Sequence, residues 1–259
     1  MAITSETELP LDSFRNEWDG IIRSIAESLG VDTSGAADTS EITRLLENAT
    51  CAKLTERARN SSLVVLSSIA GGGKSTVGGI LESLEFTRLP RVTTRVARPG
   101  EEDGHAYFFV TKEEFDRELA AGELAYAKET YSEGRGIRRS SLDAVRNGGA
   151  RYYAEGDALA YDTIKKTVHG YEDLDYCSLF LVPDSFDTAY VRLQGRIRND
   201  IANGADPTGA YKDVNDRIRA SLVYLQESGS HMRNGIYHGY LVNDDLSRVR
   251  ARLESLFLV

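Results

Sequence analysis

The sequence predicts an α/β fold with a mostly parallel sheet flanked by helices. Two observations carry this prediction. Short apolar runs alternate with helix-compatible segments from Ser61 onward, and a glycine-rich turn joins the first such run to the first such helix. Strands that alternate with helices usually pair in parallel, because each helix carries the chain back across the sheet. In such folds a ligand lies beyond the carboxyl ends of the strands.

The expected elements follow one another along the chain. The expected strands are 63–66, 106–110, 123–128, 151–154, 178–182 and 240–242. The expected helices are 74–84, 111–121, 141–147, 158–168, 185–196, 211–226 and 246–257. Thr111 and Glu114 form a capping box at the second of these helices, and Gly122 follows its end. Residues 199–209 are rich in Gly, Asn, Asp and Pro, which predicts an irregular loop.

Residues 1–60 differ from the rest and are interpreted as a helical extension of a main domain at 61–259. Apolar residues recur there at helical spacing before Gly30: Leu11, Phe14, Trp18, Ile21, Ile22, Ile25 and Leu29. A second amphipathic helix is expected over 41–49, and a short one toward Arg59. Since the extension carries no chemical motif, we interpret it as a cap on the main domain. A dimerisation element is the alternative.

The composition restricts the class of protein. Of the 259 residues, 41% are hydrophobic and 27% charged, which is ordinary for a globular protein with a sizeable core. The net charge of −9 disfavours stable binding to nucleic acid. Cys51 and Cys177 show no metal spacing and are expected to be free thiols. No secretory signal or membrane-spanning run is visible, so the expected location is cytoplasmic. The oligomeric state is not indicated.

A glycine-rich segment follows the first apolar run: Ser67-Ser68-Ile69-Ala70-Gly71-Gly72-Gly73-Lys74-Ser75-Thr76. A strand, a glycine-rich turn, Lys-Ser/Thr and a helix together are typical of a phosphate-binding P-loop. The glycines let backbone N–H groups point at phosphate oxygens, and the helix N-terminus adds further donors. Lys74 supplies a cation for the β- and γ-phosphates, and the Ser75 hydroxyl suits Mg²⁺. Ser68 replaces the first glycine of G-x-x-x-x-G-K-[ST]. An ordinary turn before a helix is the alternative.

Two arginines and a tyrosine after the P-loop predict a second phosphate site. Arg95 and Arg98 stand three residues apart, and Tyr107 follows a turn. Two guanidinium groups can grip one phosphate bidentately, and a tyrosine hydroxyl adds a third donor. The acceptor site of a kinase needs this set of groups. The alternative is a pair of solvated surface arginines, and the acidic residues 101–103 are expected to form a solvated turn.

The same segment resembles the signature T-T-R-x-P-R-x-G-E-x-x-G-x-x-Y-x-F of the guanylate kinase family, with Ala97 in place of the proline. Three further segments match family motifs in order: 136–140 (GIRRS) is similar to G-[ST]-P-R-S, 192–196 (RLQGR) to R-L-x-x-R, and 242–245 to V-N-D-D. The resemblance covers about residues 62–259. It implies the P-loop kinase fold, with an acceptor-binding region at about 91–149 and a lid at about 196–210.

The resemblance also implies a role for each matching residue. The residues implied to hold the phosphates of ATP, with Mg²⁺ at Ser75, are Gly71, Gly72, Gly73, Lys74, Ser75 and Thr76. The residues implied at the acceptor are Arg95, Arg98 and Tyr107 for its phosphate and Asp157 near its base. Lys74 and the lid-side Arg196 and Arg217 are implied to offset charge on the transferred phosphoryl group. The implied activity is transfer from Mg-ATP to a nucleoside monophosphate, a small-molecule substrate.

The positions that read guanine in the family differ in this chain. Arg91, Tyr126, Arg135 and Ile137 stand where the family has a Ser, a Glu, a Tyr and a Ser or Thr. A site that loses such hydrogen-bond partners loses discrimination between bases. The sequence therefore keeps the phosphate-binding half of the acceptor site and changes the half that reads guanine.

Several explanations remain open at this point. The acceptor is another or a modified nucleoside monophosphate, with Tyr126 stacking on its base. Alternatively, Arg91, Arg135 and Arg138 bind extra negative charge on a sugar phosphate such as ribose 1,5-bisphosphate. An alignment shifted toward Glu123 or Glu129 would restore the guanine-reading Glu. A non-catalytic protein-binding module is a fourth possibility. The intact Lys-Ser/Thr pair of the P-loop disfavours it.

Overall fold

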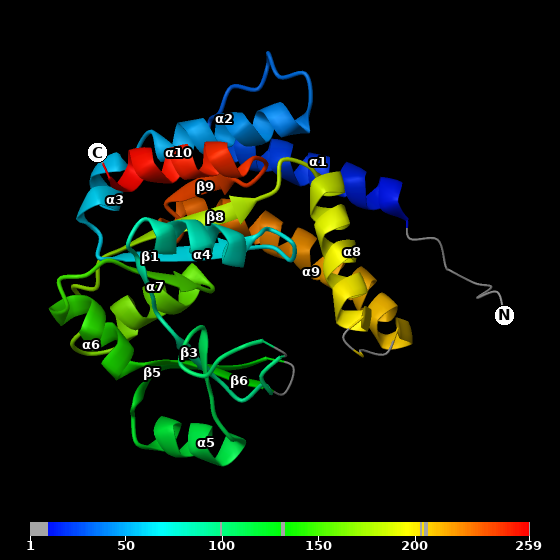
Figure 1. Ribbon diagram of the computed structural model, residues 1–259. Coiled ribbons are helices and arrows are strands. Elements are labelled where there is room, and N and C mark those ends of the chain that lie inside the picture. The colour runs from blue at the N-terminus through cyan, green and yellow to red at the C-terminus, as the bar shows by residue number, and fades with distance from the viewer. Residues whose placement is uncertain (1–9, 99, 131–132, 203, 205–206, 259) are drawn as a thin grey trace. The chain divides into compact units, whose positions relative to one another are not determined.

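The computed structural model describes residues 10–98, 100–130, 133–202, 204 and 207–258. Its internal contacts divide the chain into two compact units (Figure 1). The first unit comprises the chain up to Leu54, Ser68–Gly73 and Phe180–Arg252. The second comprises Thr55–Ser67, Lys74–Leu179 and the chain from Leu253 onward. Each unit is described by itself below.

A five-stranded sheet has the order β2-β7-β1-β8-β9. Its strands are β2 (Thr87–Arg88), β7 (Tyr152–Glu155), β1 (Leu63–Ser68), β8 (Tyr176–Val182) and β9 (Gly239–Val242). Strands β1 and β2 both pair with β7 in parallel. Every residue of β1 and β8 is buried, as expected for strands covered by helices on both faces. The predicted α/β fold with a mostly parallel sheet is confirmed.

The second unit holds a four-stranded sheet of order β4-β3-β6-β5. Its strands are β4 (Tyr107–Phe109), β3 (Arg91–Thr93), β6 (Glu133–Arg138) and β5 (Leu124–Thr130). Strand β3 pairs with β4 in parallel and with β6 antiparallel, and β5 is antiparallel to β6. One face of this sheet packs on α5 (Lys112–Ala120) through Val92, Phe115 and Leu124 (Figure 1).

The predicted capping box begins α5. The Thr111 hydroxyl accepts a hydrogen bond from Glu114 N at 3.1 Å, and the Glu114 carboxylate accepts one from Thr111 N at 2.9 Å. Gly122 follows the helix with φ of +70°, a conformation that favours glycine. The other helices of this unit are α3 (Thr55–Asn60), α4 (Lys74–Ser83), α6 (Arg139–Asn147) and α7 (Ala158–Thr167).

Helices dominate the first unit. They are α1 (Leu11–Ser28), α2 (Thr39–Cys51), α8 (Phe186–Ala202) and α9 (Pro207–Arg233), and α10 (Leu246–Phe257) begins in it. Helix α1 packs against α2, α8 and α9, and it buries Phe14, Trp18, Ile22 and Ile25 on one face. Figure 1 shows α8 and α9 side by side. Among the described residues, no helix has the length and apolar character needed to span a membrane.

The prediction of an irregular loop over residues 199–209 is wrong at both ends. Helix α8 continues to Ala202, and α9 begins at Pro207. Proline is well tolerated at the first position of a helix, where its missing N–H has no intrahelical partner. Between the two helices only Gly204 is described, with φ of +96°, and positions 203, 205 and 206 of the predicted lid lie outside the described residues.

Strands β2, β3 and β6 were not expected from the sequence. Two of them have three residues or fewer, and β6 contains two glycines. Those glycines have a packing reason, because a Cβ at Gly134 or Gly136 would lie 3.0 or 3.3 Å from the Phe115 ring. Close packing on an aromatic ring therefore overrides the low strand propensity of glycine.

Helix α2 covers the free edge of the five-stranded sheet. Thr50 Oγ1 accepts a hydrogen bond from Tyr240 N at 3.0 Å, and Glu47 Oε1 accepts one from Val242 N at 2.9 Å. Cys51 Sγ donates to Tyr240 O at 3.2 Å. Since an edge strand leaves backbone groups without a neighbouring strand, these side chains satisfy groups of β9 that would otherwise be unpaired.

We expect Thr50→Val to lower the free energy of unfolding by about 1–3 kcal/mol, because it leaves the buried Tyr240 N–H without an acceptor. Thr43→Val is the matched control. Thr43 is also buried on α2, but its hydroxyl donates to Thr39 O within the helix. Urea unfolding of both variants measures the difference. Equal stability of the two variants would contradict the edge-covering role of α2.

Candidate active site

The glycine-rich segment forms a turn between β1 and α4. Gly71 and Gly73 have φ values of +77° and +85°, which favour glycine strongly. Gly72 N donates a hydrogen bond to Ile69 O at 3.2 Å. Lys74 is the first residue of α4, so the turn ends at a helix N-terminus. This is the backbone arrangement of a phosphate-binding loop.

Ser68, which replaces the first glycine of the pattern, fits into this turn. Its hydroxyl donates to Ile69 O at 2.8 Å, and the residue is only 8% exposed. A Cβ at Gly72 would lie 2.6 Å from Ser68 Cβ. The serine is therefore accommodated because residue 72 is a glycine.

Two polar side chains lie beside Gly73 with unsatisfied buried atoms. Asn243 is 2% exposed, and its Nδ2 donates to Gly72 O at 2.9 Å. Its Oδ1 and the Nη1 of Arg192 on α8 are buried and have no hydrogen-bond partner among the described residues. A Cβ at Gly73 would lie 2.1 Å from Asn243 Nδ2 and 3.9 Å from Arg192 Nη1. Because buried polar atoms are normally paired, these two atoms indicate a place for a polar ligand.

Arg192 and Asn243 were not among the candidate residues from the sequence. Both belong to segments that resemble family motifs, 192–196 and 242–245. The order of those motifs along the chain could therefore have pointed to both residues. The sequence could not show that they lie near the glycine turn, because this depends on the packing of α8 and of the turn after β9.

The side-chain oxygens of Ser75 and Glu155 lie together in the second unit. Ser75 Oγ donates to Glu155 Oε2 at 3.1 Å, and Arg88 Nη2 pairs with Glu155 Oε1 at 2.6 Å. Within the described part of the chain, no cluster of three or more His, Cys, Asp or Glu residues could hold a metal. Mg²⁺ at nucleotide sites needs few protein ligands, since phosphates and water supply the rest. The Ser75 hydroxyl and the Glu155 carboxylate fit that requirement.

Strand register places most of the acceptor candidates on one face of the four-stranded sheet. Arg91 pairs with Tyr107, and Tyr126 pairs with Ile137. Arg135 pairs with Thr93, which is two residues from Arg91 and so on the same side. The opposite face carries Val92 and the glycines under α5. Arg91, Tyr107, Tyr126 and Arg135 therefore share the face that α5 does not cover.

Two arginines flank Tyr107 on this face. Arg91 Nη2 donates to Tyr107 Oη at 2.8 Å. The Arg95 guanidinium lies 5.4 Å from the centre of the Tyr107 ring. Guanidinium groups lie favourably against aromatic rings. Two cationic side chains therefore lie around Tyr107, one at its hydroxyl and one over its ring, as binding of an anionic group would require.

Glu101 holds the segment between the two predicted phosphate-binding arginines, so the expected solvated turn is wrong at this residue. Its carboxylate pairs with Arg95 Nη2 at 2.8 Å and accepts Arg98 N at 2.7 Å. The hydrogen bond to Glu101 raises the pKa of Arg95 above its usual value, and the guanidinium stays charged. The Arg98 side chain is exposed. The carboxylate thus orients Arg95 by an ion pair and Arg98 by its backbone.

Tyr126 and Asp157 lie near each other in the second unit. Burial and, after it, the negative charge of Asp157 raise the pKa of the Tyr126 hydroxyl, so the phenol remains neutral. Asp157 follows β7 and caps α7, where it accepts Leu159 N at 3.0 Å. A neutral phenol can both stack on a ring and donate a hydrogen bond.

Arg138 does not belong to the cluster of positive charge that was expected for a sugar phosphate. Its Nε and Nη2 donate to Glu118 at 3.0 and 2.6 Å, and its guanidinium lies over the Phe108 ring at 4.4 Å. Both partners lie on the α5 side of the sheet. The three-arginine hypothesis is therefore wrong for Arg138, because successive side chains of β6 point to opposite faces.

The remaining predicted residues are placed by their helices. Thr76 is exposed on the first turn of α4. Arg196 is exposed on α8, and Arg217 is half-buried on α9, two helices that pack against each other. The roles expected of both arginines in closing on the phosphoryl group stay predictions.

A P-loop before a helix, next to a parallel sheet, defines the class of P-loop phosphotransferases. The guanylate kinase family model matches residues 60–149. A guanylate kinase from Wolbachia pipientis is 31% identical over 75% of this chain and 88% of its own length. Those from Nocardia farcinica (30% identical; 79% and 97%) and Sus scrofa (31%; 71% and 86%) are similarly related.

The fold agrees with these relatives. The crystal structure of guanylate kinase from Anaplasma phagocytophilum matches 74% of this chain and 82% of its own chain, with a TM-score of 0.52 and 24% identity. The chain belongs to the guanylate kinase family, whose members are ATP-dependent nucleoside monophosphate kinases.

We expect Gly73→Ala to weaken Mg-ATP binding by about tenfold or more, because a residue with a Cβ is disfavoured at this φ by roughly 1–2 kcal/mol and meets Asn243. Isothermal titration with Mg-ATP measures this change. Gly79→Ala is the control, because a Cβ at this position in α4 has nothing within 4 Å. Unchanged affinity in Gly73→Ala would contradict the placement of the nucleotide phosphates at this turn.

Proposed function

We propose that this chain transfers the γ-phosphoryl group of Mg-ATP to a nucleoside monophosphate. Its base is bound by other contacts than those that bind guanine in the family. The observation that supports this most is the uncovered face of the four-stranded sheet. It carries Arg91, Tyr126 and Arg135, in place of the guanine-reading hydroxyl and carboxylate groups of the family, beside the phosphate-binding Tyr107.

The donor half of the proposal uses the P-loop. Backbone N–H groups of Gly71–Gly73, together with Lys74 and Thr76, would bind the phosphates of ATP. Mg²⁺, held at the Ser75 hydroxyl with Glu155 nearby, would supply positive charge for the phosphate oxygens. Arg192 Nη1 would donate to a phosphate oxygen, and Asn243 Oδ1 would accept from a donor such as a bound water, since both atoms are buried and unpaired among the described residues. Little covalent work is asked of the protein, since phosphoryl transfer depends on positioning and charge.

The acceptor half uses the arginines around Tyr107. Arg95 and Arg98 would hold the phosphate of the acceptor with the Tyr107 hydroxyl. The ion pair with Glu101 fixes Arg95 before the acceptor arrives, so less side-chain entropy is lost on binding. Tyr126 would stack on the base, with Asp157 and Arg135 near its edge.

The third part of the proposal concerns the lid. We place the lid at residues 196–210, within a catalytic domain at 61–259. Arg196 and Arg217 would stabilise charge on the transferred group, and closure would exclude water and suppress hydrolysis of ATP. The net charge of −9 disfavours nucleic acid as a partner, and we expect a small-molecule phosphate substrate and action in the cytoplasm.

A kinase of a sugar bisphosphate is the second candidate. It is favoured by Arg91, whose guanidinium lies 2.8 Å from Tyr107 Oη and adds a cation where guanylate kinases carry a hydroxyl. A second phosphate on the acceptor would bind such a cation well.

The deciding experiment couples ADP release to Mg-ATP turnover with GMP, dGMP, AMP, CMP, UMP, dTMP and ribose 1,5-bisphosphate, each against a blank without acceptor. We expect a nucleoside monophosphate other than GMP to stimulate release most, and Lys74→Ala to abolish it while the protein stays folded. Preference for GMP would overturn the altered-base proposal. ATP binding without stimulation by any acceptor would favour a binding module.

Arg91→Gln separates the two candidate functions. If the acceptor is a bisphosphate, its kcat/KM falls by about tenfold or more, because a charge-assisted bond to phosphate is lost. If it is a nucleoside monophosphate, kcat/KM changes less than about threefold, because Arg95 and Arg98 still bind its only phosphate and the glutamine amide can still donate a hydrogen bond to the base. Arg117→Gln, an exposed arginine on α5, is the control. A tenfold loss with a nucleoside monophosphate would place Arg91 on the shared phosphate.

A further inference from the structure

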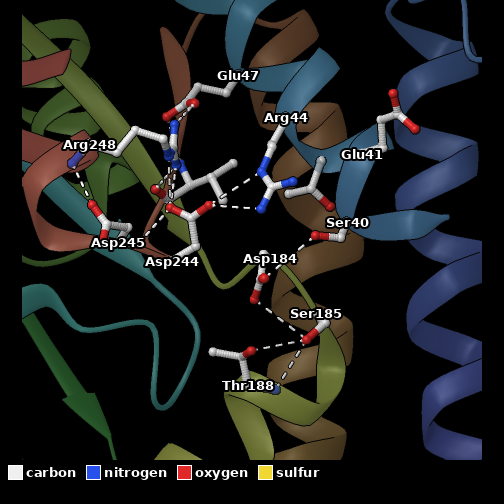
Figure 2. Close-up of polar contacts among 12 residues, drawn as sticks. Ser40, Glu41, Arg44, Glu47, Asp184, Ser185, Thr188, Asp244, Asp245 and Arg248 are labelled. Atoms are coloured by element: carbon white, nitrogen blue, oxygen red, sulfur yellow. Dashed lines mark hydrogen bonds and ion pairs between the residues drawn. The ribbon is translucent and has the colours of Figure 1, made fainter. Parts of the chain in front are cut away.

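Residues of α2 are bound to the turn that holds the P-loop. The turn is Val242-Asn243-Asp244-Asp245, which begins at the last residue of β9, and Figure 2 shows polar side chains around it. Glu47 is 1% exposed, and its carboxylate accepts Val242 N at 2.9 Å and the guanidinium of Arg248. A buried carboxylate is retained at low cost only when it is paired in this way.

The same network continues through Asp244. Arg248 donates from Nε and Nη2 to Asp244 Oδ1 at 2.8 and 2.7 Å, and its Nη2 also donates to Val242 O. Arg44 on α2 donates to Asp244 Oδ2 at 3.2 Å (Figure 2). Burial would raise the pKa of Asp244, but the hydrogen bonds from Arg248 and Asp245 N, with that from Arg44, hold it below its usual value. The carboxylate therefore stays charged and paired.

Asn243 connects this network to the nucleotide loop. Its backbone N donates to Val182 O at 2.9 Å, and its side-chain Nδ2 donates to Gly72 O at 2.9 Å. The residues on either side of Asn243 are the ones that Glu47 and Arg44 bind. A shift of the turn would therefore move the amide that holds the Gly72 carbonyl.

We propose that the N-terminal extension positions the P-loop, with Glu47 and Arg44 as positioning residues for ATP binding that act through Asn243. The extension is then part of the nucleotide site, and it is not an independent module. The inference rests on the proposed binding of ATP at the P-loop. It assigns a function to a segment in which no chemical motif was found.

The test compares Mg-ATP affinity in point variants of the full chain, because α1 and α2 bury Phe14, Trp18, Ile42 and Leu46 and their removal would expose the core. Arg44→Met breaks the bond to Asp244 but keeps most of the side-chain volume. Since the Arg44 side chain is 48% exposed, we expect the melting temperature to change little. Glu47→Gln removes the charge that Arg248 pairs with.

We expect Arg44→Met to weaken Mg-ATP binding by roughly three- to tenfold and Glu47→Gln by more, with the acceptor KM unchanged in both. Arg44→Lys should restore part of the affinity, because the ammonium keeps the charge opposite Asp244. The matched controls are Arg23→Met, an exposed arginine on α1, and Glu41→Gln. The Glu41 carboxylate accepts a hydrogen bond from Ala37 N and, among the described residues, makes no contact with the β9 turn.

Unchanged ATP affinity in Arg44→Met would overturn the inference, and so would equal losses in Arg23→Met or parallel changes in the KM of both substrates. Should Glu47→Gln fail to fold, Arg44→Met still decides. Isothermal titration with Mg-ATP needs no acceptor, so the result is separate from the identity of the acceptor. If the wild-type protein binds no ATP, the proposed function fails, and this inference fails with it.

Discussion

The hydrogen bond from Asn243 to the carbonyl of Gly72 is the contact on which the nucleotide site depends most. Gly73 leaves no room for a Cβ beside that amide, so the glycine and the asparagine require each other. The asparagine is in turn fixed by its backbone bond to β8 and by the buried network around Glu47. A loop that must present backbone N–H groups to phosphates cannot rely on its own side chains for support. The order of the loop therefore comes from the β9 turn and, through it, from the N-terminal helices.

The two faces of the four-stranded sheet have different surroundings. One face packs on α5 through Val92 and Phe115, and the ion pair of Arg138 and Glu118 also lies on this face. The other face carries Arg91 and Tyr107 and is the face to which the proposal assigns the acceptor. Because strand alternation separates the two faces, substitutions on that face need not disturb the packing on α5.

Much of the fold could be predicted because its signals are local. The capping box at Thr111 and the buried run of β1 each depend on a few adjacent residues. Strands β3 and β6 of the four-stranded sheet could not be predicted in the same way, since β3 has only three residues and the glycines of β6 are explained only by a ring from α5. Likewise the sequence placed Arg95 beside Arg98 but could not show that Glu101 pairs with the first. Arg192 and Asn243 were missed because their proximity to the P-loop depends on contacts between distant segments.

The most direct test of this account is a double-mutant cycle between Arg44→Met and Asn243→Ala, measured as Mg-ATP affinity by isothermal titration. The account predicts strong non-additivity, because Arg44 acts on the loop only through Asn243. The loss caused by Arg44→Met should therefore nearly vanish when Asn243 is already alanine. Additive losses in the double variant would show that the N-terminal extension affects ATP by another route, and would contradict the central claim.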